Sequence, residues 1–427
     1  MEVKKVHSLI DKVYKRSNLE MAWNKVRQNK GAGGIDKQSI ADYKENEEEN
    51  LTKLMVELRD KKYTPLPVKR VYIEKRGNAK EKRPLGIPTI QDRVCQQALK
   101  SRLEPIMEPY FNECSYGYRS GKSPHDAMRN IWKNIQDGDE WIVDADLKDY
   151  FGSVNHELLV ELIARKISDG RVLELIRSML QAGYVEEGKL FPTEKGTPQG
   201  GVISPLFSNI YLTPFDNVMT KRGYRLIRFA DDWVVTCKTE KEAQDALREA
   251  RNILQKLGLN LHPGKTRITH IKWGFEFLGY KVKQGKGHTL SASKRKSKSN
   301  PKNLYAIPKG KSVQRFKDEI RKRTKRRIPL TMKEVIDEIN PVIRGWANYY
   351  KKAHVRGLYN QLDRWIVRRL WSHQYKRWRN CGWRKYPNKR LYQEFGLVNM
   401  VGMIPSLQGS SESDYEKAEC GKTACSV

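Results

Sequence analysis

Two apolar stretches, Trp141-Ile-Val-Asp-Ala-Asp146 and Arg225-Leu-Ile-Arg-Phe-Ala-Asp-Asp-Trp-Val-Val-Thr236, decide the fold. The first predicts a β-strand that ends at Asp146, and the second predicts two strands joined by a tight turn at Asp231 and Asp232. Strand ends and hairpin turns are rigid supports that can bring distant carboxylates together. Their apolar flanks predict that the three aspartates are buried in a core sheet, where a charged side chain needs a function.

The three aspartates have the chemistry of a divalent-cation site. Mg²⁺ prefers hard oxygen ligands and keeps water and phosphate oxygens in its remaining positions. Two such ions about 3.5–4 Å apart stabilise the attacking and leaving oxygens of a phosphoryl displacement. We therefore predict that Asp146, Asp231 and Asp232 are catalytic and bind two Mg²⁺ ions, with Mn²⁺ as a substitute. An Asp-Asp pair without this context is more often a surface turn.

The composition indicates a polyanionic partner. The 427 residues include 82 Lys+Arg and 50 Asp+Glu, a net charge of +32. Residues 301–400 hold 26 of the basic and 7 of the acidic residues, together with five of the ten tryptophans. Interleaved cations and aromatic rings suit phosphate contacts and base stacking. Apolar residues from Val355 to Leu370 also recur at near-helical spacing, so a helical core with a solvated basic face is the other interpretation.

The absence of long apolar windows and of paired cysteines predicts the cellular setting. No window approaches about 18 consecutive apolar residues, and the six cysteines form no CxxC pair. We therefore expect no membrane span and a reducing, cytoplasmic location, such as the bacterial cytoplasm or nucleoid.

The pattern along the chain predicts an α/β part followed by a helical part. Residues 285–311 have almost no apolar side chain and predict a linker. Thr239-Glu-Lys-Glu242 predicts a helix that begins there with a capping box and ends near Gly258. The expected organisation is an N-terminal extension (1–60), an α/β region (61–285), a basic linker (286–311), an all-α domain (312–400) and a disordered tail (401–427).

Other segments supply parts that nucleotide polymerisation requires. Gly196 to Leu206 is a glycine-rich turn before an apolar helix, through which Gln199 could approach a base pair. Lys75 and Arg83 flank a Gly77-Asn78 turn and could grip a triphosphate. Lys265 could pair with a leaving pyrophosphate. Each has a plainer interpretation: an ordinary tight turn, surface charges on a basic protein, and a lysine at a helix end.

The ordered set of motifs resembles the reverse transcriptases of the group II intron maturase family. The resemblance spans roughly residues 20–400. The blocks that carry it are Asn29–Asp36, Arg83–Arg93, Ser115–Gly121, Val143–Phe151, Gly196–Asn209, Phe229–Asp232, Leu257–Lys265, Phe277–Tyr280 and Ile339–Tyr350. The resemblance implies a right-hand polymerase fold of fingers and palm with an antiparallel palm sheet, followed by an all-α thumb or X domain.

The resemblance also implies roles for individual residues. Asp146, Asp231 and Asp232 would be the catalytic triad, and Phe151, five residues after Asp146, would exclude a ribose 2′-hydroxyl. Asp146 is preferred over Asp144 because of that spacing. Gln199 would contact the incoming nucleotide or the templating pair, and Lys75, Arg83 and Lys265 its phosphates. The candidates for RNA binding in the thumb are Lys322, Arg323, Lys325, Arg326, Arg344, Arg368 and Arg369.

The implied function is RNA-templated DNA synthesis together with binding of intron RNA to assist splicing and mobility. The expected partners are group II intron RNA, an RNA template, a DNA or RNA primer and dNTPs. Phe229 replaces the family's common tyrosine, Gly152 stands where many members have Asp, and no Cys/His-rich nuclease domain follows the thumb. Two other functions fit the sequence: an RNA-binding splicing factor with a vestigial polymerase, and a free-standing or defence-associated reverse transcriptase.

Overall fold

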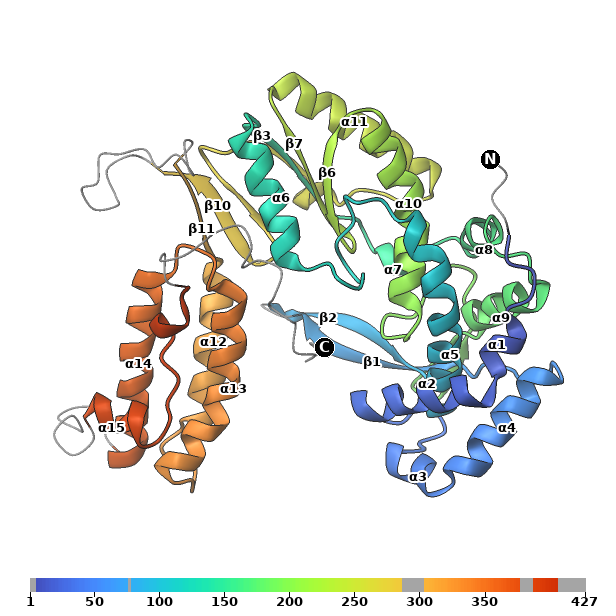
Figure 1. Ribbon diagram of the computed structural model, residues 1–427, viewed down its shortest axis with the longest axis horizontal. Helices are drawn as coiled ribbons and strands as arrows, with labels where there is room; N and C mark the ends of the chain where they lie inside the picture. Colours follow the sequence, from blue (N-terminus) through green and yellow to red (C-terminus); the bar gives the residue numbers. More distant parts are fainter. Residues whose placement is uncertain (1–4, 76–77, 286–302, 377–386, 406–427) are drawn as a thin grey trace. The chain divides into compact units, whose positions relative to one another are not determined.

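The computed structural model describes residues 5–75, 78–285, 303–376 and 387–405. The chain separates into two compact units, Met1–His270 and Ile271–Val427. Each unit has its own sheet and helices (Figure 1).

The N-terminal helices belong to the main core of the first unit. They are α1 (Ile10–Tyr14), α2 (Arg16–Asn29), α3 (Ile40–Glu45) and α4 (Glu47–Arg59), and α2 and α4 pack against α5 (Ile90–Met107). Trp23 and Leu51 are fully buried in the same cluster as Val94 and Val143. Residues 5–60 are therefore part of one folded body with the α/β region that follows.

A four-stranded sheet of order β2-β1-β4-β5 lies next in the chain. Its strands are β1 (Val68–Lys75), β2 (Asn78–Ile87), β4 (Tyr184–Glu186) and β5 (Lys189–Phe191). β1 and β2 form a long antiparallel hairpin in which Ile73 is opposite Arg83, and β1 pairs with β4 in parallel.

The second sheet carries the predicted aspartates. It is antiparallel, has the order β6-β7-β3-β8, and consists of β3 (Trp141–Ala145), β6 (Arg225–Phe229), β7 (Asp232–Cys237) and β8 (Arg267–His270). α11 (Glu240–Lys256) packs on β3 and β7, and α6 (Pro124–Gln136) packs on β6 and β7 (Figure 1). Thr239 caps α11 as predicted, but the Glu242 carboxylate accepts from Lys238 N–H instead of Thr239 N–H.

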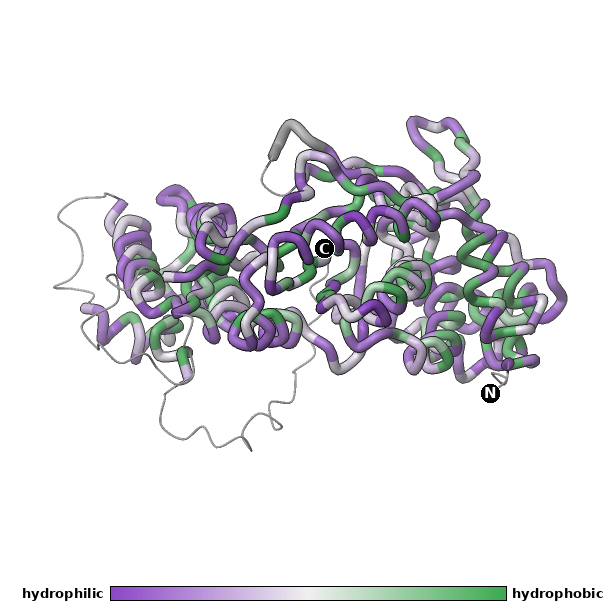
Figure 2. The backbone as a smooth tube through the Cα atoms, turned by 90° about the horizontal axis from the view of Figure 1, so that it is seen from above, coloured by the Kyte–Doolittle hydropathy of each residue, from purple (hydrophilic) through white to green (hydrophobic). Residues whose placement is uncertain are grey.

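The first unit has further helices and short turns. They are the helices α7 (Tyr150–Ser153), α8 (His156–Ala164), α9 (Gly170–Gln181) and α10 (Ser204–Lys221), with short 3₁₀ turns η1 (Glu108–Tyr110) and η2 (Pro263–Lys265). Hydrophilic and hydrophobic positions alternate along the helices, as expected where one side of each helix is buried (Figure 2).

The second unit begins with a three-stranded antiparallel sheet, which the sequence interpretation did not place there. Its strands are β9 (Phe275–Phe277), β10 (Tyr280–Gln284) and β11 (Leu304–Pro308). The helices α12 (Gly310–Arg323), α13 (Met332–Tyr350), α14 (Arg356–Tyr375) and α15 (Asn388–Gln393) follow, with the 3₁₀ turn η3 (Val401–Met403).

Two predicted boundaries are wrong. The linker was predicted to continue to residue 311, but Leu304–Pro308 pairs with β10 and α12 begins at Gly310, because Leu304 and Ala306 are buried apolar residues. The all-α domain is preceded by strands of its own unit. The predicted tail begins too early, since Met400 and Val401 donate backbone N–H groups to Asp363. Residues 286–302 and 406–427 lie outside the described residues.

Within the described ranges, no helix is both long enough and apolar enough to cross a bilayer. Cys95, Cys114 and Cys237 are buried free thiols.

Candidate active site

The aspartate turn lies at one end of the antiparallel sheet. β6 ends at Phe229, which is opposite Asp232, the first residue of β7. Between them Ala230 adopts φ of +59°, a left-handed conformation that costs a non-glycine residue roughly 1 kcal/mol. Ala145 on β3 is opposite Trp233 on β7, so Asp146 leaves the sheet at the same end as the turn. The predicted hairpin and the predicted strand end are both present.

The charges at this end of the sheet are coupled. Burial raises the pKa of the Asp231 carboxyl, and the negative charge of Asp146 raises that pKa further. Arg83 and Lys265 act in the opposite direction on the same pKa. Lys265 Nζ lies 2.5 Å from Asp146 Oδ2. Asp146, Asp231, Arg83 and Lys265, from four separate sequence blocks, therefore share one electrostatic environment.

The prediction that all three aspartates are buried is wrong. Asp232 is exposed, Asp231 is only partly buried, and 19% of the Asp146 side chain is accessible. The reason is that the apolar flanks bury the strands, whereas the turn and the strand end project past the residues that cover the sheet.

The donor set fits a divalent cation in its chemistry. Asp146 and Asp231 provide hard carboxylate oxygens, and the rise in the pKa of Asp231 caused by the charge of Asp146 is the repulsion that a bound cation would remove. Across the described ranges, however, no three His, Cys, Asp or Glu side chains are close enough together to hold a metal ion. The protein side chains alone do not form a closed cage.

The choice between Asp144 and Asp146 gains a structural argument. Arg267 on β8 donates from Nε at 3.0 Å and Nη2 at 2.8 Å to the same oxygen, Asp144 Oδ2. Asp144 is thus paired across the β3–β8 pair and Asp146 is paired with Lys265, but it is the charge of Asp146 that raises the pKa of Asp231.

Phe151 and Gln199 line one cavity. Its volume is about 230 Å³, and its walls also include Arg70, Gly152 and Thr197. Two polar atoms at this cavity, Gln199 Oε1 and the buried Thr197 Oγ1, make no hydrogen bond within the described structure. Two wall residues of the cavity therefore carry buried polar atoms that are unpaired within the described structure.

The glycine-rich loop is held tightly beside this cavity. Thr197 N donates to Phe151 O at 2.7 Å, and Gly86 N donates to Gln199 O at 2.7 Å. A side chain at Gly196, whose φ is +93°, would come within 2.9 Å of Phe151 O. Glycine is needed there because the loop approaches the α7 backbone so closely.

The Gly152 departure now has a physical account. The Asp149 carboxylate lies where a Cβ on residue 152 would be, so any side chain at 152 would displace Asp149. Asp149 and Gly152 both line the same cavity.

The β1–β2 hairpin brings Arg83 near the aspartate turn. Arg83 acts on the pKa of both Asp231 and Tyr118, and Tyr118 is half exposed beside the turn. Tyr118 is a candidate site residue that the sequence interpretation did not single out. The Lys75 side chain lies outside the described residues.

The predicted RNA-binding residues of the second unit occupy different environments. Lys322, Lys325, Arg326, Arg344 and Arg368 are exposed. Arg323 is partly buried and pairs with Glu319, and Arg326 Nε also donates to Ser372 Oγ at 3.0 Å. Arg369 is partly buried, and burial lowers its pKa from the usual guanidinium value.

Arg369 has an evident structural task. It donates from Nε to Thr324 Oγ1 at 3.0 Å and from Nη2 to Thr324 O at 2.9 Å, at the C-terminal end of α12. It therefore satisfies a terminal helix carbonyl, as cationic side chains commonly do.

A buried polar network behind the turn was also missed. Arg228 of β6 is fully buried, pairs with the fully buried Asp216 of α10, and donates from Nη1 to Ala230 O at 2.9 Å. An arginine between the apolar residues Ile227 and Phe229, two residues before Ala230, was the available signal.

Comparison with known proteins agrees with the order of these elements. Residues 73–282 match the family "Reverse transcriptase (RNA-dependent DNA polymerase)", and residues 313–393 match "Group II intron, maturase-specific domain". Protein YkfC of Escherichia coli is 37% identical over 53% of this chain and 69% of its own length. The group II intron-encoded protein LtrA of Lactococcus lactis is 30% identical over 74% of this chain and 65% of its own length.

A more distant relative is an uncharacterised 91 kDa protein in the cob intron of Schizosaccharomyces pombe, 28% identical over 74% of this chain. The chain spans 47% of that protein, so it covers about half to two thirds of the length of these relatives. With both domains matched in order and the aspartate turn in place, the chain belongs to the group II intron reverse transcriptase and maturase family.

Proposed function

We propose that the protein is an RNA-directed DNA polymerase that also binds intron RNA to assist splicing and mobility. The observation that carries this proposal is the electrostatic coupling of Asp146 and Asp231, from the two matched sheet segments, inside the reverse transcriptase match. The maturase-specific match that follows supports the RNA-binding role.

In the proposed reaction a primer 3′-hydroxyl displaces pyrophosphate from a dNTP. Asp146, Asp231 and Asp232 would hold two Mg²⁺ ions, which when bound stabilise the attacking and leaving oxygens. The protein's own contribution is position: β3 and the β6–β7 turn present the carboxylates, and neighbouring cations offset their mutual repulsion. Lys265 pairs with Asp146 in the absence of substrate and is within the same charge environment as Arg83.

The cavity lined by Phe151 and Gln199 would receive the sugar and base of the dNTP. Phe151 would exclude a 2′-hydroxyl by contact with the sugar, and Gln199 Oε1 is an unpaired acceptor for the nucleotide or the templating pair. Lys75, Arg83 and Lys265 would contact the phosphates. The right-hand arrangement of fingers, palm and thumb is part of this proposal.

The basic helices of the second unit would bind structured RNA through its backbone and shape, which is how folded RNA is usually recognised. The splicing chemistry would then belong to the RNA, with the protein neutralising charge and holding the RNA fold.

Primer extension tests the polymerase proposal directly. The purified protein, an RNA template with an annealed DNA primer, dNTPs and MgCl₂ should give a full-length cDNA, and Asp231→Ala should give none. Absence of product from the wild type would favour an RNA-binding protein without polymerase activity. Full activity in Asp231→Ala would place the site elsewhere.

A splicing assay tests the second role. With the intron that surrounds the gene transcribed in vitro at low Mg²⁺, the protein should accelerate splicing, and Asp231→Ala should do so equally. A gene without a surrounding catalytic intron would instead support a free-standing or defence-associated reverse transcriptase.

A further inference from the structure

The fully buried ion pair behind the aspartate turn has a geometry that stability alone does not explain. Arg228 and Asp216 are both almost completely inaccessible, and they form a fork in which Arg228 Nε lies 2.7 Å from Asp216 Oδ1 and Nη2 lies 2.6 Å from Oδ2. A buried pair of this kind is on average no more stabilising than apolar side chains of the same volume. Its presence therefore calls for a role in specifying a conformation.

The third nitrogen of the Arg228 guanidinium, Nη1, makes a hydrogen bond to the turn itself. Nη1 donates to Ala230 O at 2.9 Å and to Asn209 Oδ1 at 3.1 Å, so four separate contacts use the guanidinium. Ala230 is the residue in the left-handed conformation immediately before Asp231. The hydrogen bond to its carbonyl holds the peptide group that links it to Asp231.

The other side of the turn is held by the same network. Asn209 Nδ2 donates to Gly117 O at 2.9 Å, Arg228 N donates to Cys114 O at 2.8 Å, and Tyr116 N donates to Arg228 O at 2.8 Å. Gly117 packs so closely on the Ala230 backbone that a Cβ on residue 117 would overlap it. The turn is thus fixed between a buried guanidinium and a neighbouring loop.

We propose that Arg228, anchored by Asp216 and Asn209, is a positioning residue that sets the backbone of the turn and thereby the direction of the Asp231 carboxylate. This inference rests on the proposed function, because its purpose is to orient an aspartate toward a divalent cation. Arg228 itself contacts neither substrate nor cation. Displacement of a reacting group by about 1 Å can reduce a rate by about a hundredfold.

The test replaces both charged partners together. Arg228→Met alone would leave a buried, unpaired Asp216 and would be strongly destabilised. In the double variant Arg228→Met/Asp216→Leu no unpaired charge remains, and the added volume at 216 offsets part of the loss at 228. We expect it to fold with a melting temperature near that of the wild type and to lose the hydrogen bond to Ala230 O.

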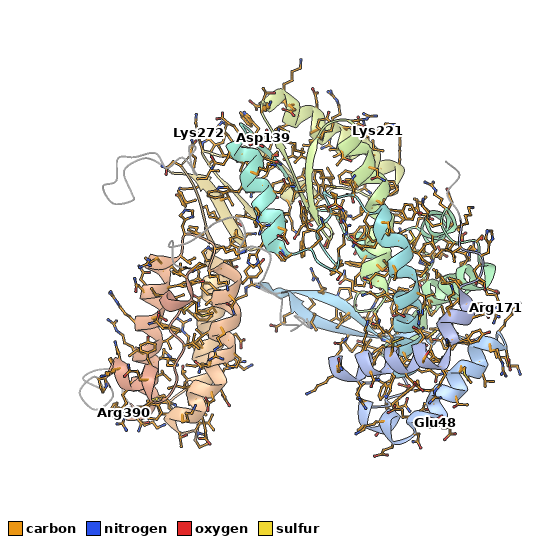
Figure 3. The ribbon with its side chains drawn as sticks, viewed as in Figure 1. Glu48, Asp139, Arg171, Lys221, Lys272 and Arg390 are labelled. Atoms are coloured by element: carbon orange, nitrogen blue, oxygen red, sulfur yellow. The ribbon has the colours of Figure 1, made fainter. Side chains whose placement is uncertain are left out.

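The matched control lies at the other end of the same strand. Arg225 Nη1 lies 3.5 Å from the buried Asp139 Oδ2, just before β3 (Asp139 is labelled in Figure 3). Arg225→Met/Asp139→Leu removes an arginine from β6 and an aspartate from the segment before β3 without touching the turn. It should keep the wild-type rate and the wild-type response to Mg²⁺.

Two readouts are needed. In single-turnover primer extension, the Arg228→Met/Asp216→Leu variant should add nucleotides about tenfold to a hundredfold more slowly at saturating dNTP, with little change in KM for dNTP. In the absence of nucleic acid, the rise in melting temperature caused by MgCl₂ should be smaller than in the wild type. The Mg²⁺ titration is independent of polymerisation, so an inactive wild type would refute the proposed function and leave this readout to decide the inference.

A folded double variant with the wild-type rate and the wild-type Mg²⁺ response would overturn the proposal. If the double variant does not fold, Arg228→Lys replaces it. A lysine can still neutralise Asp216, but its single amine cannot also bind Asn209 and Ala230 O in the same geometry. It should fold and show the same two defects, and wild-type behaviour in Arg228→Lys would also overturn the proposal.

Discussion

The two units use charge in opposite ways. In the first unit, a few acidic groups at the end of one sheet lie beside single, well-placed cations: Lys265 on Asp146, Arg83 near Asp231. In the second unit many cations lie exposed on the helices, and several pair with an acidic residue one turn away, such as Arg321 with Asp318 and Lys333 with Asp337. The difference separates a site whose chemistry depends on position from a surface whose affinity depends on total charge.

The same contrast holds for arginines. Arg228 in the first unit is fully buried and fully paired, and Arg368 in the second unit is exposed. Arg369, the next residue, caps α12. Depending on its place in the fold, an arginine in this protein contacts a turn, completes a helix end or faces solvent.

The largest expected effect belongs to Asp231. Asp231→Asn keeps the shape of the side chain and removes its charge, so nucleotide addition should fall by at least about a thousandfold, the loss of several kcal/mol of stabilisation in the transition state. Intron RNA binding, measured by filter binding on the same preparation, should stay within about twofold of wild type. Equal losses of nucleotide addition and of RNA binding would show that the two activities are not separated between the two units as proposed.

The next effect concerns the choice of sugar. Phe151→Val shortens the side chain at the cavity, so ribonucleotides should compete with deoxynucleotides at least about tenfold better, judged by kcat/KM for single-nucleotide addition of each. Leu180→Val, a substitution at another residue lining the cavity, is the control. If Phe151→Val discriminates as well as the wild type does, Phe151 does not contact the sugar.

Adjacent arginines of α14 offer a third comparison. Arg369→Ala removes hydrogen bonds to the end of α12 and should destabilise the protein by about 1–3 kcal/mol in urea unfolding. Arg368→Ala should leave stability unchanged and lower the salt slope of RNA binding by about 1. If Arg368→Ala destabilised the protein and Arg369→Ala lowered the salt slope, exposure in α14 would not predict RNA contact.

The smallest effect is a dependence of stability on pH. Because the pKa of Asp231 is raised in the folded state, its protonated form is favoured, and this stabilisation is complete below the ordinary carboxyl pKa. This stabilisation is lost as pH rises through the raised pKa, because Asp231 then becomes charged in the folded state. Without divalent cations, Asp231→Asn should therefore gain stability relative to the wild type as pH rises above the ordinary carboxyl pKa, and MgCl₂ should reduce that gain. A difference in stability between the variant and the wild type that does not change with pH would show that ionisation of Asp231 is not its cause.

Much of the fold could be read from the sequence because its signals are local. The strand before Asp146, the hairpin at Asp231 and the helix after Thr239 each follow from apolar spacing and turn or cap residues within a few positions. The pairing of β11 with β10 could not be read, since it joins strands separated by a long polar segment whose composition predicts a linker.

The site was predictable in its residues and less so in its surroundings. Motif order identified Asp146, Phe151, Gln199 and Lys265, and the structure places them in two groups: Lys265 pairs with Asp146 at the end of the sheet, and Phe151 and Gln199 line the cavity. Exposure of Asp232, the capping role of Arg369 and the bond from Arg228 to Ala230 O depend on tertiary contacts between distant segments, and no local pattern encodes them.

The most direct test of the account is single-turnover primer extension on an RNA template, with wild type and Asp231→Asn compared at equal occupancy of the template by protein. We expect rapid, Mg²⁺-dependent cDNA synthesis by the wild type and none by the variant, although both bind the template. Synthesis by Asp231→Asn at the wild-type rate would contradict it.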